Sequence, residues 1–244
     1  MCQLGKKIMS WEKISLNLAN KILGRQNSLY VTMNCTLPTL TVTAETANGS
    51  ELFKIRFPYS TSFEPDSKSL CNTPIFNLVL ILIKSGIATI GFFENGSLSS
   101  HKVFRAYMVR KKQGKSQVKY LKTKGKSRAG SRVRLQETNE FFESINSRLQ
   151  ELAKHHPIDK IAISCSKTLL PYFFNSKTKP PFEMHDPRIF RVPIHVPNAT
   201  HEVLLKAHGH LSSCRILVGR EFEKDFLDLK QSDMVDGTIE GDDW

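Results

Sequence analysis

Residues 75–93 read IFNLVLILIKSGIATIGFF, an almost unbroken apolar run in a chain of 244 residues. Its β-branched residues, such as Val79, Ile81 and Ile87, are typical of strands. Gly86 has the backbone freedom that a tight turn requires. The run therefore predicts two buried strands, residues 78–83 and 87–93, joined by a turn at residues 84–86.

A membrane-spanning segment is the alternative interpretation of the same run, which is long enough and is followed by basic residues. Lys84 would then lie near the centre of the bilayer, at a cost of roughly 2.5–3.5 kcal/mol on insertion scales. We therefore favour the two strands and expect no membrane partner.

Upstream of this run, the spacing of apolar residues predicts a helix over residues 10–24, with Ser10 as its N-cap. Alternating apolar and polar residues predict short antiparallel strands at 28–34, 40–44 and 51–57. Asn48-Gly49 predicts a tight turn. Residues 58–72 are polar and rich in turn formers, so we expect a connection between subdomains there.

Downstream, residues 94–96 (Glu-Asn-Gly) predict a second turn and residues 101–109 the third strand of a meander. Helices and strands then alternate, which is typical of an α/β layer with some parallel pairing. The expected helices are 136–154, 167–175 and 201–213, the last capped at 198–200, and the expected strands are 158–164, 189–196 and 215–218. We expect a mixed α/β fold around one sheet with flanking helices, followed by an unstructured acidic tail from residue 225.

A basic arm follows the meander. Residues 96–135 contain no Asp or Glu and thirteen Lys and Arg, whereas the formal net charge of the whole chain is +12. The rest of the chain is therefore close to neutral. Gly114, Gly125 and Gly130 interrupt a helix, and like charges repel one another, so we expect a flexible loop over residues 111–134. Such an arm suits a polyanion, with an affinity that depends on salt.

Most enzyme signatures are absent from the sequence. There is no GxGxxG or GxxxxGK[ST] phosphate loop and no HExxH motif. The eight histidines form no recognisable zinc set, and we expect capping or surface roles for them. Five scattered cysteines argue against a disulfide framework and suit a reducing cytosol. Cys165 lies at an expected strand end, where a buried thiol is favoured over a nucleophile.

One glutamine distinguishes the arm from a non-specific basic tail. Gln117 follows Gly114 and Ser116. A glutamine is a poor general base, but its amide can orient a water molecule, and a flexible glycine allows close approach to RNA.

Several ordered blocks resemble the release-factor-like domain of the peptidyl-tRNA hydrolases of ribosome quality control, a family that includes ankyrin-repeat and zinc-finger proteins. The resemblance extends from about Ser85 to Val218. The blocks are GFFENG (91–96), HKVFRAYMVR (101–110), GKSQ (114–117), GK (125–126), AGS (129–131), DPRI (186–189) and VP (192–193).

The resemblance implies a ribonuclease-H-like domain similar to the middle domain of eukaryotic and archaeal class-one release factors. It implies that Gln117 matches the catalytic glutamine, with Gly114 and Ser116 positioning its loop. The expected reaction is hydrolysis of the ester in peptidyl-tRNA on the large ribosomal subunit, without metal or cofactor. The expected RNA-binding residues are Arg110, Lys111, Lys112, Lys115, Lys119, Lys122, Lys124, Lys126, Arg128, Arg132 and Arg134.

The chain also departs from this family. Lys115 stands where a second glycine is usual, and the block after the loop, RLQETNE (134–140), matches only partly. There is no zinc finger or ankyrin array, and residues 1–70 have no counterpart in the family.

We therefore expect an N-terminal helix-and-strand region at 1–70, a release-factor-like catalytic domain at 71–222 and an acidic, disordered tail at 223–244. The expected partners are large-subunit rRNA, peptidyl-tRNA and other quality-control factors, for a monomeric, cytoplasmic protein. Two alternatives stay open: a ribosome- or RNA-binding factor without hydrolysis, and a nuclease that cuts the tRNA near its CCA end.

Overall fold

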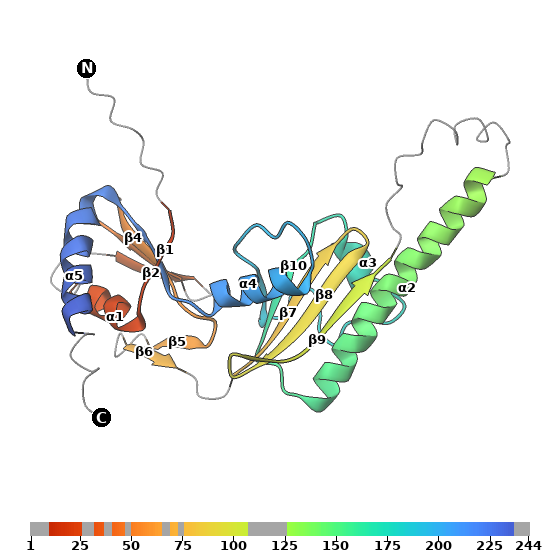
Figure 1. Ribbon diagram of the computed structural model, residues 1–244, viewed down its shortest axis with the longest axis horizontal. Helices are drawn as coiled ribbons and strands as arrows, with labels where there is room; N and C mark the ends of the chain where they lie inside the picture. Colours follow the sequence, from red (N-terminus) through yellow and green to blue (C-terminus); the bar gives the residue numbers. More distant parts are fainter. Residues whose placement is uncertain are drawn as a thin grey trace, which may run out of the picture. The chain divides into compact units, whose positions relative to one another are not determined.

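The computed structural model describes residues 10–25, 32–36, 41–46, 50–64, 69–72, 76–106 and 126–236 (Figure 1). Contacts between residues divide the chain into two compact units. One unit joins residues 1–73 to residues 210–244, and the other comprises residues 74–209. The chain has a mixed α/β fold with two five-stranded sheets and flanking helices.

The sheet of unit 74–209 has the strand order β11-β10-β7-β8-β9. Its strands are β7 (Asn77–Lys84), β8 (Ile87–Glu94), β9 (Ser97–Arg105), β10 (Lys160–Ser164) and β11 (Ile189–Arg191). The first three form an antiparallel meander, while β10 runs parallel to both β7 and β11. The predicted strand pair, the third meander strand and the parallel pairing are confirmed, although β11 is shorter than expected.

Two tight turns connect the meander at the predicted positions. Gly86 has φ 78°, and at the second turn Asn95 and Gly96 have φ 51° and 82°. Such left-handed conformations favour Gly, and also Asn, whose short polar side chain tolerates them.

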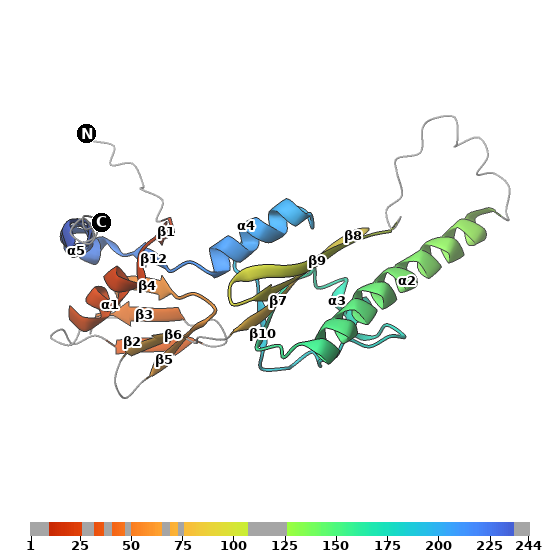
Figure 2. The ribbon, with the colours of Figure 1, turned by 60° about the horizontal axis from the view of Figure 1, so that its bottom comes forward.

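Helices cover both faces of this sheet (Figure 2). On one face, α2 (Lys126–His155) and α3 (Leu170–Phe174) form a core with alternate residues of β7 and β8. The buried helical residues of this core are Phe141, Phe142, Ile145, Leu149, Leu152 and Phe173. The five of these residues that belong to α2 are spaced as on one apolar helical face, as the sequence predicted for residues 136–154.

On the opposite face lies α4 (His201–Leu211), which packs across β8 and β9. His208 stacks on Phe93 with ring centroids 3.7 Å apart, and His201 stacks on His101 at 4.1 Å. Gly91 lies beneath Leu204, because a Cβ at this glycine would come within 2.6 Å of the leucine Cδ2. The expected cap is confirmed, since the backbone N–H of Val203 donates to Thr200 Oγ1 at 3.3 Å.

Helix α2 corrects one prediction about the basic arm. We expected a flexible segment as far as residue 134, but the helix begins at Lys126 and includes Gly130. A glycine inside a helix costs about 1 kcal/mol relative to alanine. The physical reason for the difference is that a helix nucleated by packed residues extends at little further cost, because each added residue gains one hydrogen bond.

The other unit contains a second five-stranded sheet, in the order β1-β12-β4-β3-β2. Its strands are β1 (Glu12–Lys13), β2 (Thr32–Thr36), β3 (Thr41–Glu45), β4 (Glu51–Arg56) and β12 (Arg215–Val218). We expected β12 in the same sheet as the meander. This prediction was wrong, because β12 pairs with β4 in the second sheet.

Two helices cover one face of this second sheet, α1 (Leu16–Arg25) and α5 (Glu223–Asp236), the latter preceded by the 3₁₀ helix η3 (Arg220–Phe222). Helix α5 occupies much of the segment that we expected to be unstructured. Phe226 and Leu229 explain the difference, because they are buried in the core of this unit.

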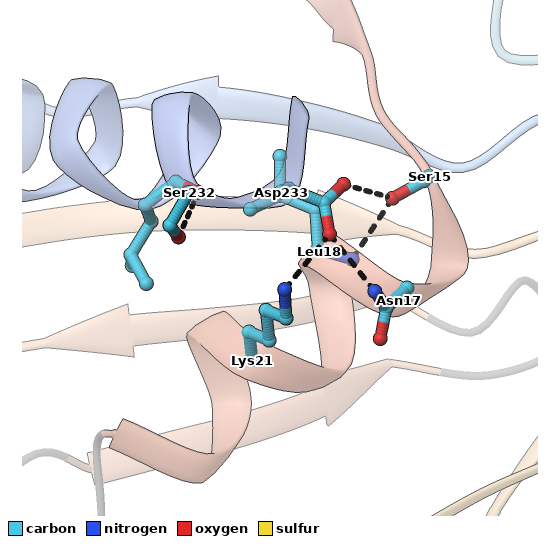
Figure 3. A network of polar contacts seen from close by, with 7 residues as sticks. Ser15, Asn17, Leu18, Lys21, Ser232 and Asp233 are labelled. Atoms are coloured by element: carbon cyan, nitrogen blue, oxygen red, sulfur yellow. Dashed lines mark hydrogen bonds and ion pairs between the residues drawn. The ribbon is translucent and has the colours of Figure 1, made fainter. Parts of the chain in front are cut away.

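The start of α1 is fixed by polar contacts with α5 (Figure 3). Ser15, rather than the predicted Ser10, caps the helix, because its Oγ accepts the backbone N–H of Leu18 at 2.9 Å. The Ser15 hydroxyl also donates to Asp233 at 2.8 Å, and Asn17 and Lys21 contact the same carboxylate at 2.9 and 3.3 Å. Asp233 therefore ties the two helices together.

The remaining predictions for the N-terminal region have mixed outcomes. Strands β3 and β4 lie where they were predicted, whereas β2 is displaced from the predicted 28–34. The expected connection at 58–72 contains a two-stranded hairpin, β5 (Thr61–Glu64) and β6 (Ser69–Asn72). The predicted turn at Asn48-Gly49 lies outside the described residues.

Within the apolar run, residues 77–93 form a strand hairpin. In the described part of the chain, no helix has both the length and the apolar character that crossing a bilayer requires.

Two glycine substitutions test this packing and should change the free energy of unfolding in opposite directions. A Cβ at Gly219 would lie 2.2 Å from the carbonyl oxygen of Glu51, whereas one at Gly209 in α4 has nothing within 4 Å. Gly219→Ala should lower the free energy of unfolding by about 1–3 kcal/mol, as overpacking does. Gly209→Ala should raise it by up to about 1 kcal/mol, through helix propensity. Urea denaturation measures both, and equal effects of the two variants would contradict the packing around β12.

Candidate nucleic-acid interface

One edge of the meander sheet positions the basic loop. Strand β9 ends at Arg105, opposite Ile87, and the N–H of Ala106 donates to the carbonyl oxygen of Gly86 at 2.9 Å. The chain therefore leaves the sheet beside the β7–β8 turn. Strands β7, β10 and β11 run parallel to one another, so their carboxyl ends, at Lys84, Ser164 and Arg191, lie at this same edge.

Four cations lie at this edge or directly after it. Arg105, Lys167 and Arg191 are exposed, and Lys84 is half-buried. None of the four forms an ion pair within the described part of the chain. We call these four residues the cationic edge.

Carboxylates lie at the other end of the sheet. Glu94 ends β8, and Asp159 accepts the backbone N–H of Asn77 at 2.7 Å where β7 begins. Asp186 forms an ion pair with Arg188 at 2.7 Å, ahead of β11. The Arg188 hydrogen bond holds the pKa of the Asp186 carboxyl below its usual range. Lys160 and Arg188 lie at the same end and offset part of this negative charge. The two ends of the sheet still differ in charge, and the chain leaves β9 at the more positive end.

Helix α2 carries the chain back from the loop and is fixed to the domain through Asn146. This side chain is fully buried, and its Nδ2 donates to the carbonyl oxygens of Phe173 and Thr178, both at 2.8 Å. Arg148 of the same helix donates to Ser100 Oγ of β9 at 3.1 Å. Both flanks of the loop, β9 and α2, are therefore parts of one packed unit.

An open groove of about 420 Å³ lies beside α2 but does not suit an anion. Its lining includes three glutamates from one helix, and only two basic side chains compensate them. The lining residues are Lys102, Glu140, Glu143, Ser144, Ser147, Arg148, Glu151 and Thr178. The carboxylates would repel a phosphate, so the cationic edge is the better candidate.

Cys165 lies at the cationic edge but is unsuited to nucleophilic attack at neutral pH. Burial raises the pKa of its thiol to about 12, against a smaller opposing effect of Lys84 and Arg191. Since the thiolate is the reactive form, the thiol is inert near pH 7. The predicted lack of reactivity agrees with this environment, although Cys165 is half-buried rather than fully buried.

The predicted catalytic loop itself lies outside the described residues. This applies to Gln117, to the positioning residues Gly114 and Ser116, and to the RNA-binding candidates Arg110, Lys111, Lys112, Lys115, Lys119, Lys122 and Lys124. The other four candidates, Lys126, Arg128, Arg132 and Arg134, fall in the first turns of α2, which extend past the sheet in Figure 1.

None of the four residues of the cationic edge was among the predicted site residues, although Arg105 lies within the basic segment of residues 96–135. The other three are Lys84, Lys167 and Arg191. They are far apart in the chain and come together only because β10 and β11 pair in parallel beside β7. A search for basic residues directly after each predicted strand would have found Lys84 and Lys167, because parallel strands end at one edge. Arg191 falls inside the predicted strand 189–196, and only the structure shows that β11 ends there.

Alkylation kinetics test the environment of Cys165. At pH 8 the native chain should react with iodoacetamide at this residue roughly a thousandfold more slowly than the urea-unfolded chain, because a pKa near 12 leaves little thiolate. Peptide mapping by mass spectrometry resolves the site. Similar rates in the folded and unfolded chains would contradict the burial.

One family model and two solved structures are similar to this chain. The sequence model of the family described as "Bacteroidetes VLRF1 release factor" matches residues 78–218. A solved structure, "Vms1 mitochondrial localization core", is 14% identical, with a TM-score of 0.41 and coverage of 83% of this chain and 82% of that chain. An archaeal translation termination factor, aRF1, is 13% identical, with a TM-score of 0.32 and coverage of 68% and 42%. No curated protein matches the sequence. Because the family match spans more than half of its length, this chain belongs to the Bacteroidetes VLRF1 release-factor family.

Proposed function

We propose that this protein hydrolyses peptidyl-tRNA on the large ribosomal subunit and so releases stalled nascent chains. The observation that carries the proposal is the cationic edge, at which the chain leaves the sheet ahead of the segment that contains Gln117, in a chain of a release-factor family. An unpaired row of cations there favours a phosphodiester backbone close to the loop.

The proposed reaction needs little chemistry from the protein. The oxygen of a water molecule bonds to the ester carbonyl carbon, the bond from that carbon to the ribose oxygen breaks, and the ribose oxygen takes up a proton. The Gln117 amide would orient the water, since it can donate and accept hydrogen bonds at once. Orientation of a reactant against a fixed ester lowers the barrier without a metal or cofactor.

The proposed partners follow from this reaction. Large-subunit rRNA and peptidyl-tRNA would contact the cationic edge and the basic residues of the loop, with other quality-control factors assisting a monomeric protein in the cytoplasm. The catalytic domain that the sequence places at residues 71–222 includes the whole of unit 74–209.

A pair of glutamine variants tests the catalytic assignment. Gln117→Ala should slow peptide release from stalled large-subunit complexes by about a hundredfold or more, because the water loses its orientation. Gln113→Ala is the matched control, since it removes another glutamine four residues away and should leave release unchanged. Release is measured as the loss of peptidyl-tRNA on a denaturing gel. Equal rates for the two variants would remove Gln117 from the mechanism.

The same gel separates the two alternative functions. A tRNA product shorter than the intact CCA end would indicate a nuclease. Binding to the large subunit with no liberated peptide, even at enzyme excess, would indicate a factor that binds without hydrolysis.

Neutralising the cationic edge should weaken binding rather than chemistry. In the double variant Lys84→Gln/Arg191→Gln, the concentration of stalled subunits that gives half-maximal release should rise, while the maximal rate stays the same. The salt dependence of binding should also become shallower, because fewer counterions are released. Lys154→Gln/Lys224→Gln removes two exposed cations elsewhere and is the control. A lower maximal rate with unchanged half-saturation would contradict a binding role.

A further inference from the structure

A second cationic surface lies on the sheet of the unit formed by residues 1–73 and 210–244. Lys13 of β1 pairs in register with Arg215 of β12, and Arg215 pairs with Arg56 of β4. Residues directly opposite one another on neighbouring strands point to the same face of a sheet. The three basic side chains therefore form one row across three strands.

This row lies on the face away from α1 and α5. The neighbouring register pair, Ile216 and Ile55, is fully buried in the core with α1 and α5. Because side chains alternate between faces along a strand, the basic row belongs to the other face. Arg56 and Arg215 are half-buried there, and Lys13 is exposed. We call this the open face.

The arrangement is unfavourable unless an anion is present. Like charges directly opposite on neighbouring strands destabilise a sheet. The next pair along the same face, Leu217 and Lys54, adds a fourth cation. The strand register defines one row through Arg56 and a second through Lys54. Neither row includes an Asp or Glu on any strand of the sheet. In the described part of the chain, none of the four basic residues forms an ion pair.

The two arginines are held in place by neutral groups. The Arg56 guanidinium lies 4.4 Å from the ring centroid of Trp11. The Arg215 Nε donates to Ser213 Oγ at 3.2 Å. Burial, and to a smaller extent the charge of Arg215, lowers the pKa of Arg56. The guanidinium groups are thus preorganised by contacts that leave their charge uncompensated.

His210 adds a polar atom without a partner. Burial, followed by the charges of Arg215 and Arg56, lowers its pKa to about 4, so the imidazole is neutral at pH 7. Its buried Nε2 has no hydrogen-bond partner among the described residues. Because the two arginine charges act on this imidazole, His210 adds an unsatisfied polar group close to the basic row.

We infer that the open face binds the phosphodiester backbone of single-stranded RNA through Lys13, Arg56 and Arg215. Guanidinium groups match phosphate geometry in a bidentate way, and the Trp11 indole offers a ring on which a base can stack. A membrane surface fits less well, because the exposed large apolar residues of this unit, Leu16 and Leu227, lie on the helices. The inference concerns binding by this unit and does not rest on the proposed hydrolysis.

Trp11 provides a local reporter for the open face, because the Arg56 guanidinium lies over its ring. The chain has two tryptophans, Trp11 and Trp244, so the full-length variant Trp244→Phe reports only on the open face. Titration with a twelve-nucleotide oligo(U) should change the Trp11 emission. When Lys13→Gln/Arg215→Gln is added to this variant, the oligonucleotide concentration that gives half of the emission change should rise at least tenfold. Neither substitution removes the Arg56–Trp11 contact.

Two controls keep the result specific. Arg220→Gln removes an exposed arginine at the other end of β12 and should leave the titration unchanged. Arg215→Lys keeps the charge, so it should retain most of the binding if the double variant fails through charge rather than misfolding. A titration of Trp11 that is absent, or that is identical in the double variant, would overturn the inference. So would a stronger response to poly-glutamate than to oligo(U), which would assign the face to an acidic protein.

Discussion

Strand β7 is hydrogen-bonded on both edges, to β8 on one side and to β10 on the other, and all but its last residue are buried. Because both faces need a cover, helices pack on each, with α2 and α3 on one side and α4 on the other. This single strand connects the antiparallel meander with the parallel strands. The geometry of the site depends on β7, since β8 and β10 pair with it and in turn pair with β9 and β11. The ends of β9, β10 and β11 therefore lie together at the cationic edge.

Charge follows this topology. Acidic residues lie at the end of the sheet where β7 begins, and the basic residues of the cationic edge lie where β7 ends. The loop that contains Gln117 therefore starts from a surface suited to phosphate groups, and α2, held by Asn146, receives the chain on its return. The proposed reaction depends mainly on orientation, and both flanks of the segment that contains Gln117, β9 and α2, are fixed within one packed unit. The open face of the other sheet would supply a second, separate contact with RNA.

Local patterns predicted the fold where a short segment decides its own structure. The turns at Gly86 and Asn95-Gly96, the meander and the apolar face of α2 were all readable from spacing and turn chemistry. Long-range pairing was not readable: β12 joins β4 in the second sheet, and α5 forms because Phe226 and Leu229 are buried there. The site divides in the same way between local and long-range information. The basic segment was evident from composition, whereas Lys84 and Arg191 come together only through the parallel pairing of distant strands.

In the proposed reaction, water attacks the ester carbonyl of peptidyl-tRNA. Release from stalled large subunits can therefore be carried out in ¹⁸O-labelled water. We expect one ¹⁸O atom in the carboxylate of the released peptide and an unlabelled 3′-terminal ribose on an intact tRNA. A label on the nucleic acid, or a peptide released with nucleotides still attached, would contradict it.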